Sequence, residues 1–178
     1  MSGQILQNDY LRLEVSPSTG GAVVGFDFIN GGGTHPIFRR CMTDITDGLS
    51  PLDTSCFPLL PYSNRLRDGC FIFDGTKYNY PLNCPPEIHA SHGDAWMRPW
   101  DVTSQSKHHI EMNLGPTAEQ PIKYSAIQVF RLLDTELSIS LQITNFGMVK
   151  SPFGMGLHPY FIREDDTQII CNLESQWE

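Results

Sequence analysis

Two prolines precede an asparagine–arginine pair in residues 57–66 (FPLLPYSNRL). The proline ring fixes one backbone torsion, so Pro58 and Pro61 restrict the path that leads to Arg65. A guanidinium presents a fork of N–H donors that suits hydroxyl, carboxylate and carbonyl oxygens. Arg65 is therefore a candidate for binding an oxygen-rich ligand, and the alternative is an arginine that hydrogen-bonds the carbonyls of its own loop.

Histidines and indoles gather in residues 89–100 (HASHGDAWMRPW). Histidine donates and accepts hydrogen bonds near neutral pH, and the apolar face of a pyranose can stack on the rings of Trp96 and Trp100. A metal site is the competing interpretation, because only two residues separate His89 from His92. Zinc requires one or two further Cys or His ligands. Nothing in the sequence fixes such ligands near this segment, so we predict no metal here.

His158 lies between a glycine-rich approach and a proline in residues 154–161 (GMGLHPYF). An imidazole held in this way can serve as an acid–base group, and a structural histidine is the alternative. Nucleophilic catalysis lacks support, because the sequence has no G-x-S-x-G motif and no evident Cys–His pairing. The carboxylates of Asp165-Asp166, and of Asp44 and Asp47, are typical of solvated loops.

The segments between these clusters have apolar side chains at every second position. Leu137 to Ile143 alternate with serine, glutamine and threonine, and residues 11–15 and 24–28 show the same pattern. This period is typical of strands with one apolar face. Asp74-Gly75 lies between two short aromatic runs and predicts a hairpin over residues 70–80. Further strands are predicted at residues 100–103, 109–114, 125–133 and 167–173.

No long segment has a helical period, and 15 glycines and 13 prolines interrupt the chain. We therefore expect an all-β protein, most plausibly an antiparallel β-sandwich. Residues 1–178 should form a single domain, because no linker-like segment divides them. Residues 176–178 follow directly on a strand-like run, so we expect the sandwich to be incomplete at its C-terminal side.

Composition narrows the function classes. A formal net charge of −8 disfavours nucleic acids and anionic membranes as partners. No stretch has the roughly 20 apolar residues that span a bilayer, and the first ten residues do not resemble a signal peptide. The five cysteines form no C-x-x-C pair, which favours reduced thiols and a cytoplasmic location. The oligomeric state is open.

Three of these segments, in this order, resemble the aldose 1-epimerase (galactose mutarotase-like) family. They are residues 61–66, His92-Gly93 with its tryptophan-rich continuation, and residues 156–161. The Asp74-Gly75 hairpin also fits, and the resemblance covers nearly the whole chain. It implies a galactose mutarotase-like sandwich (a supersandwich) with an open sugar cleft. It also implies an isomerase that interconverts the α- and β-anomers of a free aldohexose without a cofactor.

The resemblance gives roles to three side chains. Arg65 and His92 bind the sugar, and His158 is the general acid that protonates the ring oxygen. A histidine with the ordinary pKa of about 6.5 can exchange that proton near neutral pH. Family members are longer, and their general base is a C-terminal glutamate that this sequence does not match. Because a positioned base contributes about 10²–10⁴-fold, we expect this chain alone to be weak or inactive.

Three alternatives remain. The chain could be a non-catalytic carbohydrate-binding protein that keeps Arg65, His92 and the aromatic residues, or an unstable product with no molecular role. It could also be a mutarotase for a hexose phosphate, because an arginine binds phosphate with two donors at once. The arginines close to the motifs in sequence are Arg39, Arg40, Arg67 and Arg98.

Overall fold

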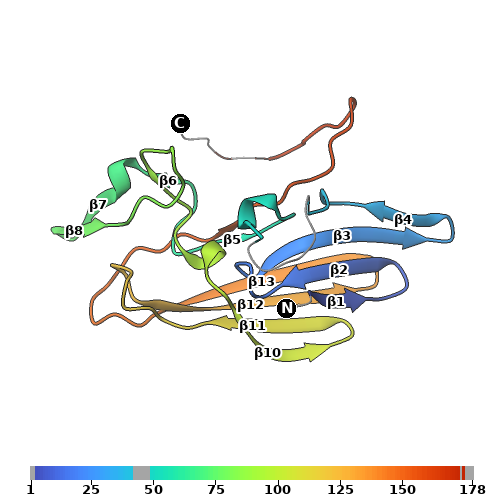
Figure 1. Ribbon diagram of the computed structural model, residues 1–178, viewed down its shortest axis with the longest axis horizontal. Coiled ribbons are helices and arrows are strands. Elements are labelled where there is room, and N and C mark those ends of the chain that lie inside the picture. Colours follow the sequence, from blue (N-terminus) through green and yellow to red (C-terminus); the bar gives the residue numbers. More distant parts are fainter. Residues whose placement is uncertain (1–2, 42–48, 173, 175–178) are drawn as a thin grey trace.

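The computed structural model describes residues 3–41, 49–172 and 174. Two four-stranded antiparallel sheets dominate these residues, and Figure 1 shows them lying against each other. The first sheet consists of β1 (Gln4–Gln7), β2 (Leu11–Ser16), β3 (Ala22–Asn30) and β4 (Gly33–Pro36). The second consists of β10 (Asp101–Ser106), β11 (His109–Leu114), β12 (Tyr124–Leu133) and β13 (Glu136–Asn145).

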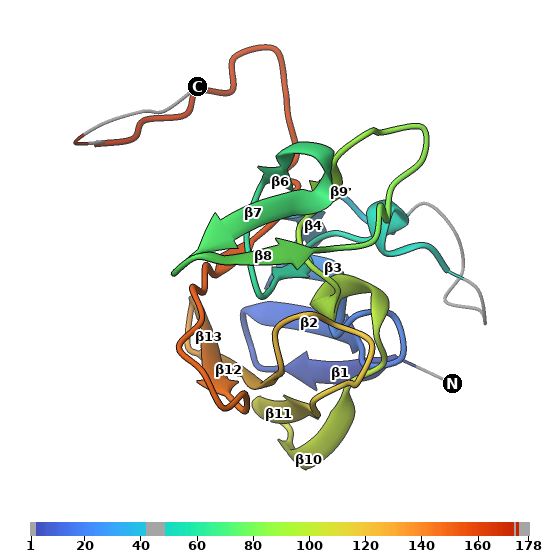
Figure 2. The same cartoon turned by 90° about the vertical axis from the view of Figure 1, so that its left-hand side faces the viewer.

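One hydrophobic core fills the space between the sheets. Leu6, Leu13 and Val15 of the first sheet are fully buried in the same cluster as Ile110 and Phe130 of the second. The alternation of buried and less buried residues along β2 and β11 produces this core, because every second side chain points to the same face. Figure 2 shows the second sheet curving around the first. The chain is therefore an all-β antiparallel sandwich, as the sequence predicts.

Among the described residues, three pairs of short strands and three 3-10 turns lie above the sheets, and they carry or adjoin the motif residues (Figure 1). The pairs are β5 (Pro58–Leu59) with β14 (Gly156–Leu157), β6 (Arg65–Leu66) with β9 (Ala90–Ser91), and β7 (Cys70–Phe73) with β8 (Thr76–Asn79). The turns are η1 (Pro51–Asp53), η2 (Arg67–Gly69) and η3 (Ala95–Met97). The β7–β8 pair confirms the hairpin predicted at Asp74-Gly75.

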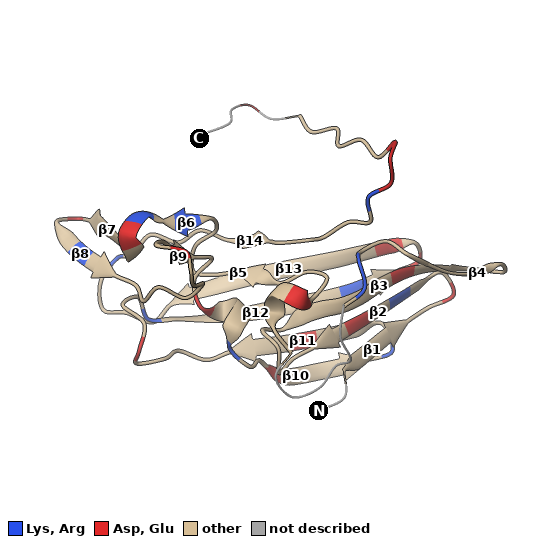
Figure 3. Cartoon of the chain, turned by 45° about the horizontal axis from the view of Figure 1, so that its top comes forward, with Lys and Arg blue, Asp and Glu red and all other residues tan. Residues whose placement is uncertain are grey.

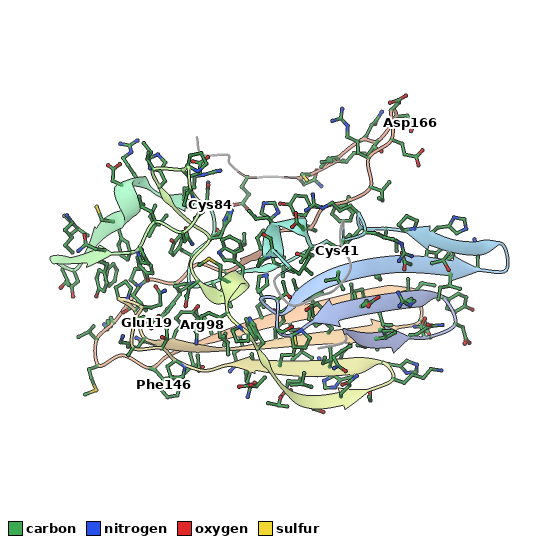
Figure 4. All side chains as sticks on the ribbon, in the orientation of Figure 1. Cys41, Cys84, Arg98, Glu119, Phe146 and Asp166 are labelled. Atoms are coloured by element: carbon green, nitrogen blue, oxygen red, sulfur yellow. The ribbon has the colours of Figure 1, made fainter. Side chains whose placement is uncertain are left out.

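The predicted strand at residues 167–173 is wrong over its described part. Residues 167–172 form no strand and are exposed, with Ile169 at 87% and Ile170 at 88% exposure. Figure 1 shows this segment running above the sandwich and apart from it, and its backbone pairs with no strand of the described residues. Asp165 and Asp166 are exposed, as predicted (Asp166 is labelled in Figure 4). Asp44, Asp47 and Leu173 lie outside the described residues.

Charged residues of both signs are spread along β2, β3 and the short strands, as Figure 3 shows. Asp27 on β3 is fully buried, and its Oδ2 atom lies 2.8 Å from Nη2 of Arg40 and 3.8 Å from Nη1 of Arg12. This pairing stabilises a carboxylate that would otherwise be costly to bury. Within the described residues no helix is long and apolar enough to cross a membrane.

Candidate active site

Two distant segments run side by side and fix the position of His158. β14 pairs with β5, so that Gly156 faces Leu59 and Leu157 faces Pro58. The backbone N–H of His158 continues this pairing by donating to the carbonyl of Phe57 at 3.0 Å. The N–H of Tyr160 donates to Ser55 at 2.9 Å. The backbone of His158 is therefore held from both sides along the chain.

Aromatic rings fix the orientation of the His158 imidazole. Phe57 stacks on it with ring centroids 4.8 Å apart and an interplanar angle of 17°. Tyr160 lies 4.7 Å away at 38°, and the guanidinium of Arg39 lies 3.6 Å above the Tyr160 ring. Phe57 stacks in turn on Trp96 at 5.4 Å. We call Phe57, Trp96 and Tyr160 the aromatic cluster; it restricts the imidazole to a narrow range of orientations.

His92 lies directly after β9, in a turn with an uncommon backbone conformation. Its φ is 62°, and its N–H donates to the carbonyl of Asn64 at 2.9 Å. Gly93 follows with φ 70° and packs so closely that a Cβ atom there would lie 1.9 Å from the carbonyl oxygen of Leu60. Only glycine allows this approach. The close packing of Gly93 on Leu60 therefore sets the position of His92.

Arg65 reaches the same region from β6, where it pairs with Ser91, the residue before His92. Its side chain is 49% exposed, and its Nε atom lies 3.7 Å from Oε2 of the half-exposed Glu87. Exposed pairs of this kind contribute little to stability. The guanidinium thus keeps donors that a ligand could use.

The structure brings the two candidate imidazoles together. Their ring centroids lie 5.5 Å apart at an interplanar angle of 74°. Both side chains are half-buried, and the Nδ1 atom of each is enclosed without a hydrogen-bond partner among the described residues. Their Nε2 atoms also form no hydrogen bond within that part of the chain. Two neighbouring imidazoles with unused nitrogens can donate to and accept from the hydroxyls of one ligand.

The pKa of His92 is lowered, first by burial and then by the positive charges of His158 and Arg65. A lowered pKa keeps the imidazole neutral at pH 7, so that it carries one donor and one acceptor nitrogen. Burial also raises the pKa of the Cys56 thiol and of the Tyr62 hydroxyl, each to about 12. Cys56 and Tyr62 are therefore neutral near pH 7.

Asp94 holds the loop that carries His92 in place, and the sequence analysis did not identify this residue. Only 3% of the residue is exposed. Its Oδ1 atom accepts a 2.6 Å hydrogen bond from the Tyr124 hydroxyl, and its Oδ2 atom accepts one from Nη1 of Arg98 at 3.2 Å (Arg98 is labelled in Figure 4). Burial raises the pKa of Asp94, and both partners oppose that rise. In the sequence, its position two residues after His92 could have pointed to this role.

The two indoles act differently from the sequence expectation. Trp96 and Trp100 are each only 3% exposed, so neither presents a free face on which a sugar could stack. Their Nε1 atoms donate to the carbonyls of Gly93 and Ala95, each at 3.0 Å. The indoles support the His92 loop from within, because a buried tryptophan satisfies its N–H on the nearest carbonyl.

His89 and three of the four arginines also have structural partners. The Nδ1 atom of His89 accepts from the N–H of Asp68 at 3.2 Å. Nη2 of Arg39 donates to the Thr54 carbonyl at 2.9 Å. Arg40 pairs with Asp27 and Arg98 with Asp94, as described above. Arg67 alone of the four makes no such side-chain contact with the described residues.

A nearby apolar cavity of about 300 Å³ does not include the two histidines. It is lined by residues of the segment that leads to Arg65, by β7, and by residues 152–154 of the segment that leads to His158. Its walls include Tyr62, Leu66, Phe71 and Tyr80. The polar groups of the candidate site therefore converge around the imidazole pair, outside this cavity.

Comparison with known proteins places this arrangement in a family. The family model of the aldose 1-epimerases matches residues 7–178. The chain belongs to the aldose 1-epimerase family. The match includes the segments that carry Arg65, His92 and His158, the residues that the sequence resemblance singled out.

Individual relatives match most of this chain. The uncharacterized protein YphB of Escherichia coli K12 is 31% identical over 97% of this chain and 56% of its own length. A crystal structure of a candidate aldose 1-epimerase from Escherichia coli K12 is 31% identical, with a TM-score of 0.79 over 90% of this chain and 52% of that one.

A galactose mutarotase related enzyme from Lactobacillus acidophilus has the same fold at 17% identity. Its TM-score is 0.72, over 93% of this chain and 51% of that one. The sandwich is therefore of the galactose mutarotase-like type. The chain spans about half the length of these relatives.

Proposed function

We propose that this chain carries the sugar-binding and acid residues of an aldose 1-epimerase-type isomerase, a reaction class that interconverts the α- and β-anomers of a free aldohexose by acid–base ring opening. The observation that carries the proposal is the convergence of His92 and His158, whose centroids lie 5.5 Å apart although their segments are distant in sequence. Membership of the aldose 1-epimerase family supports the same reaction class.

In this proposal His92 and Arg65 bind sugar hydroxyls. His92 is suited to the task because its lowered pKa keeps it neutral, with one donor and one acceptor nitrogen. Arg65 adds donors from the neighbouring strand β6. Together they would orient the pyranose ring over the imidazole pair.

His158 would deliver the proton to the ring oxygen, while the anomeric hydroxyl loses its proton to a base. The stacking of Phe57 and the contact with Tyr160 support this role, because an acid must be held in a fixed orientation toward the atom it protonates. Within the described residues no carboxylate hydrogen-bonds to either imidazole. The sequence does not match the glutamate that serves as general base in the family, so we propose that these 178 residues alone are a weak or inactive catalyst that still binds sugar.

We also propose that residues 1–178 act as one domain, which the single core shared by both sheets supports. A cytoplasmic location is proposed as well, because the five cysteines are free thiols. A hexose phosphate is a less favoured substrate. The side chains of Arg39, Arg40 and Arg98 are engaged with the protein itself.

The proposal is tested by two measurements on the same protein. Tryptophan fluorescence, titrated with galactose and glucose, should report binding, because Trp96 hydrogen-bonds the residue after His92. Polarimetry of freshly dissolved α-galactose should show little acceleration over buffer. Absence of binding for every free aldose would overturn the sugar site. Strong acceleration that His158→Gln abolishes would overturn the need for a further base.

If the chain binds sugar but does not accelerate mutarotation, two interpretations remain, and a longer family member distinguishes them. If a longer relative that carries the same three side chains accelerates mutarotation, these side chains belong to a catalytic site. If the relative also binds without acceleration, the carbohydrate-binding alternative is correct. Preference for glucose 6-phosphate over glucose would instead favour the hexose-phosphate alternative.

A further inference from the structure

The loop that joins β8 to β9 carries an asparagine whose amide is fully used. Oδ1 of Asn83 accepts from the N–H of Ser91 at 2.8 Å. Its Nδ2 donates to the carbonyl of Ser91 at 2.7 Å and to the carbonyl of Gly93 at 2.8 Å. Figure 4 labels Cys84, the next residue on this loop. One half-buried side chain thus grips the backbone on both sides of His92.

The hydrogen bonds of Asn83 act on a strained point of the backbone. His92 has a φ of 62°, a conformation that non-glycine residues adopt only when their surroundings hold them in it. The carbonyl of Gly93 accepts from Asn83 and also from Nε1 of Trp96 at 3.0 Å. The N–H of His92 is held by Asn64. Asn83 is the only one of these groups that contacts the chain before and after His92.

We propose that Asn83 is a positioning residue for His92: it holds the histidine in the conformation that points its imidazole toward His158. This inference rests on the proposed sugar-binding role of His92. Loss of the amide removes three hydrogen bonds that fix residues 91–93, and the backbone at His92 relaxes toward an ordinary conformation. The imidazole pair then separates, and the sugar must bring it back together when it binds.

A matched pair of variants separates positioning from stability. Asn83→Ala removes the grip, and Asn8→Ala removes a similar one at the turn between β1 and β2. Asn8 is also half-buried and makes three hydrogen bonds, to the carbonyl of Asp134 and from the N–H groups of Tyr10 and Leu11. Asn83→Asp serves as a second variant, because it keeps the side-chain shape and the acceptor for Ser91 but loses both donors.

The first readout needs no sugar. The pH titration of the His92 imidazole, followed by NMR, should move toward the ordinary value in Asn83→Ala, because a released ring is less buried and farther from His158. The titration should not move in Asn8→Ala. If it is unchanged in Asn83→Ala as well, or moves equally in both variants, Asn83 does not position His92.

The second readout is the dissociation constant for galactose. Asn83→Ala and Asn83→Asp should weaken binding about tenfold, which corresponds to about 1.4 kcal/mol, whereas Asn8→Ala should bind as the unaltered protein does. Equal affinities for all variants would overturn the inference. If the unaltered protein binds no sugar, the proposed function fails, and the His92 titration alone still decides whether Asn83 positions the ring.

Discussion

Replacing Gly93 by alanine tests whether close backbone packing sets the position of His92. The added Cβ would lie 1.9 Å from the Leu60 carbonyl oxygen and 2.5 Å from Cδ of Pro61. Real Cβ atoms essentially never come within 3.0 Å of such atoms, so the backbone at 93 must move by about 1 Å. Gly75→Ala is the matched control. Gly75 has a φ of 72°, and a Cβ there meets nothing within 4 Å.

The expected cost of each variant follows from these contacts. In Gly75→Ala the only cost is that an alanine must adopt the left-handed conformation, which lowers the free energy of unfolding by about 1–2 kcal/mol. Gly93→Ala carries the same strain and also displaces the Leu60 carbonyl, which accepts from Asp94 at 3.1 Å and from Ala95 at 3.3 Å. Two weakened hydrogen bonds add about 1 kcal/mol each. We therefore expect a total of about 3–4 kcal/mol for Gly93→Ala.

Urea unfolding of both variants gives these free energies directly, and sugar titration gives the functional consequence. Gly93→Ala should not bind sugar even in the absence of urea, where it is folded, because the displaced loop carries His92. Gly75→Ala should bind as the unaltered protein does. Equal destabilisation of the two variants, or full sugar affinity in folded Gly93→Ala, would show that the close packing of Gly93 does not set the position of His92.

Three further predictions follow from the buried groups. NMR titration should give His92 a pKa below 6.5. Because the unfolded chain then takes up its proton first as pH falls, the contribution of His92 to stability should decrease as pH drops through about 6.5. Tyr124→Phe removes a charge-assisted hydrogen bond to buried Asp94, and urea unfolding should show a loss of about 1.5–3 kcal/mol. Iodoacetamide at pH 8, followed by mass spectrometry, should modify exposed Cys171 much faster than Cys56, whose pKa is raised to about 12.

The strongest sequence patterns predicted the sandwich correctly. The strand over 109–114 is observed with the same bounds, and the alternation beginning at Leu137 lies on β13. Such segments are predictable because a period of two follows directly from strand geometry. The strand predicted at 167–172 is not observed, because Ile169 and Ile170 are adjacent rather than alternating and no strand in the described part of the chain pairs with them.

The candidate site was predictable only in part. Arg65, His92 and His158 were found through their motifs, but their meeting depends on the β5–β14 and β6–β9 pairs. Strands of two residues have no periodicity, so these long-range pairings leave no signal in the sequence. Asn83 escaped notice for the same reason: its grip on the His92 loop is a contact between separate segments.

A histidine–tryptophan cluster in the sequence also does not show whether its tryptophans stack on a sugar or support the loop from within. Trp96 and Trp100 were expected to face a ligand, yet both are buried and hydrogen-bonded to the backbone. A tryptophan satisfies the same sequence pattern in either position, because its ring is apolar and its N–H is polar. Burial, which depends on the whole fold, decides between the two.

We propose that the two imidazoles form one sugar site. Proton–carbon NMR of the histidine side chains during titration with galactose tests it most directly. The resonances of His92 and His158 should shift together, with a single dissociation constant, while those of His35 and His108 stay in place. Shifts confined to other histidines, or separate dissociation constants for His92 and His158, would contradict it.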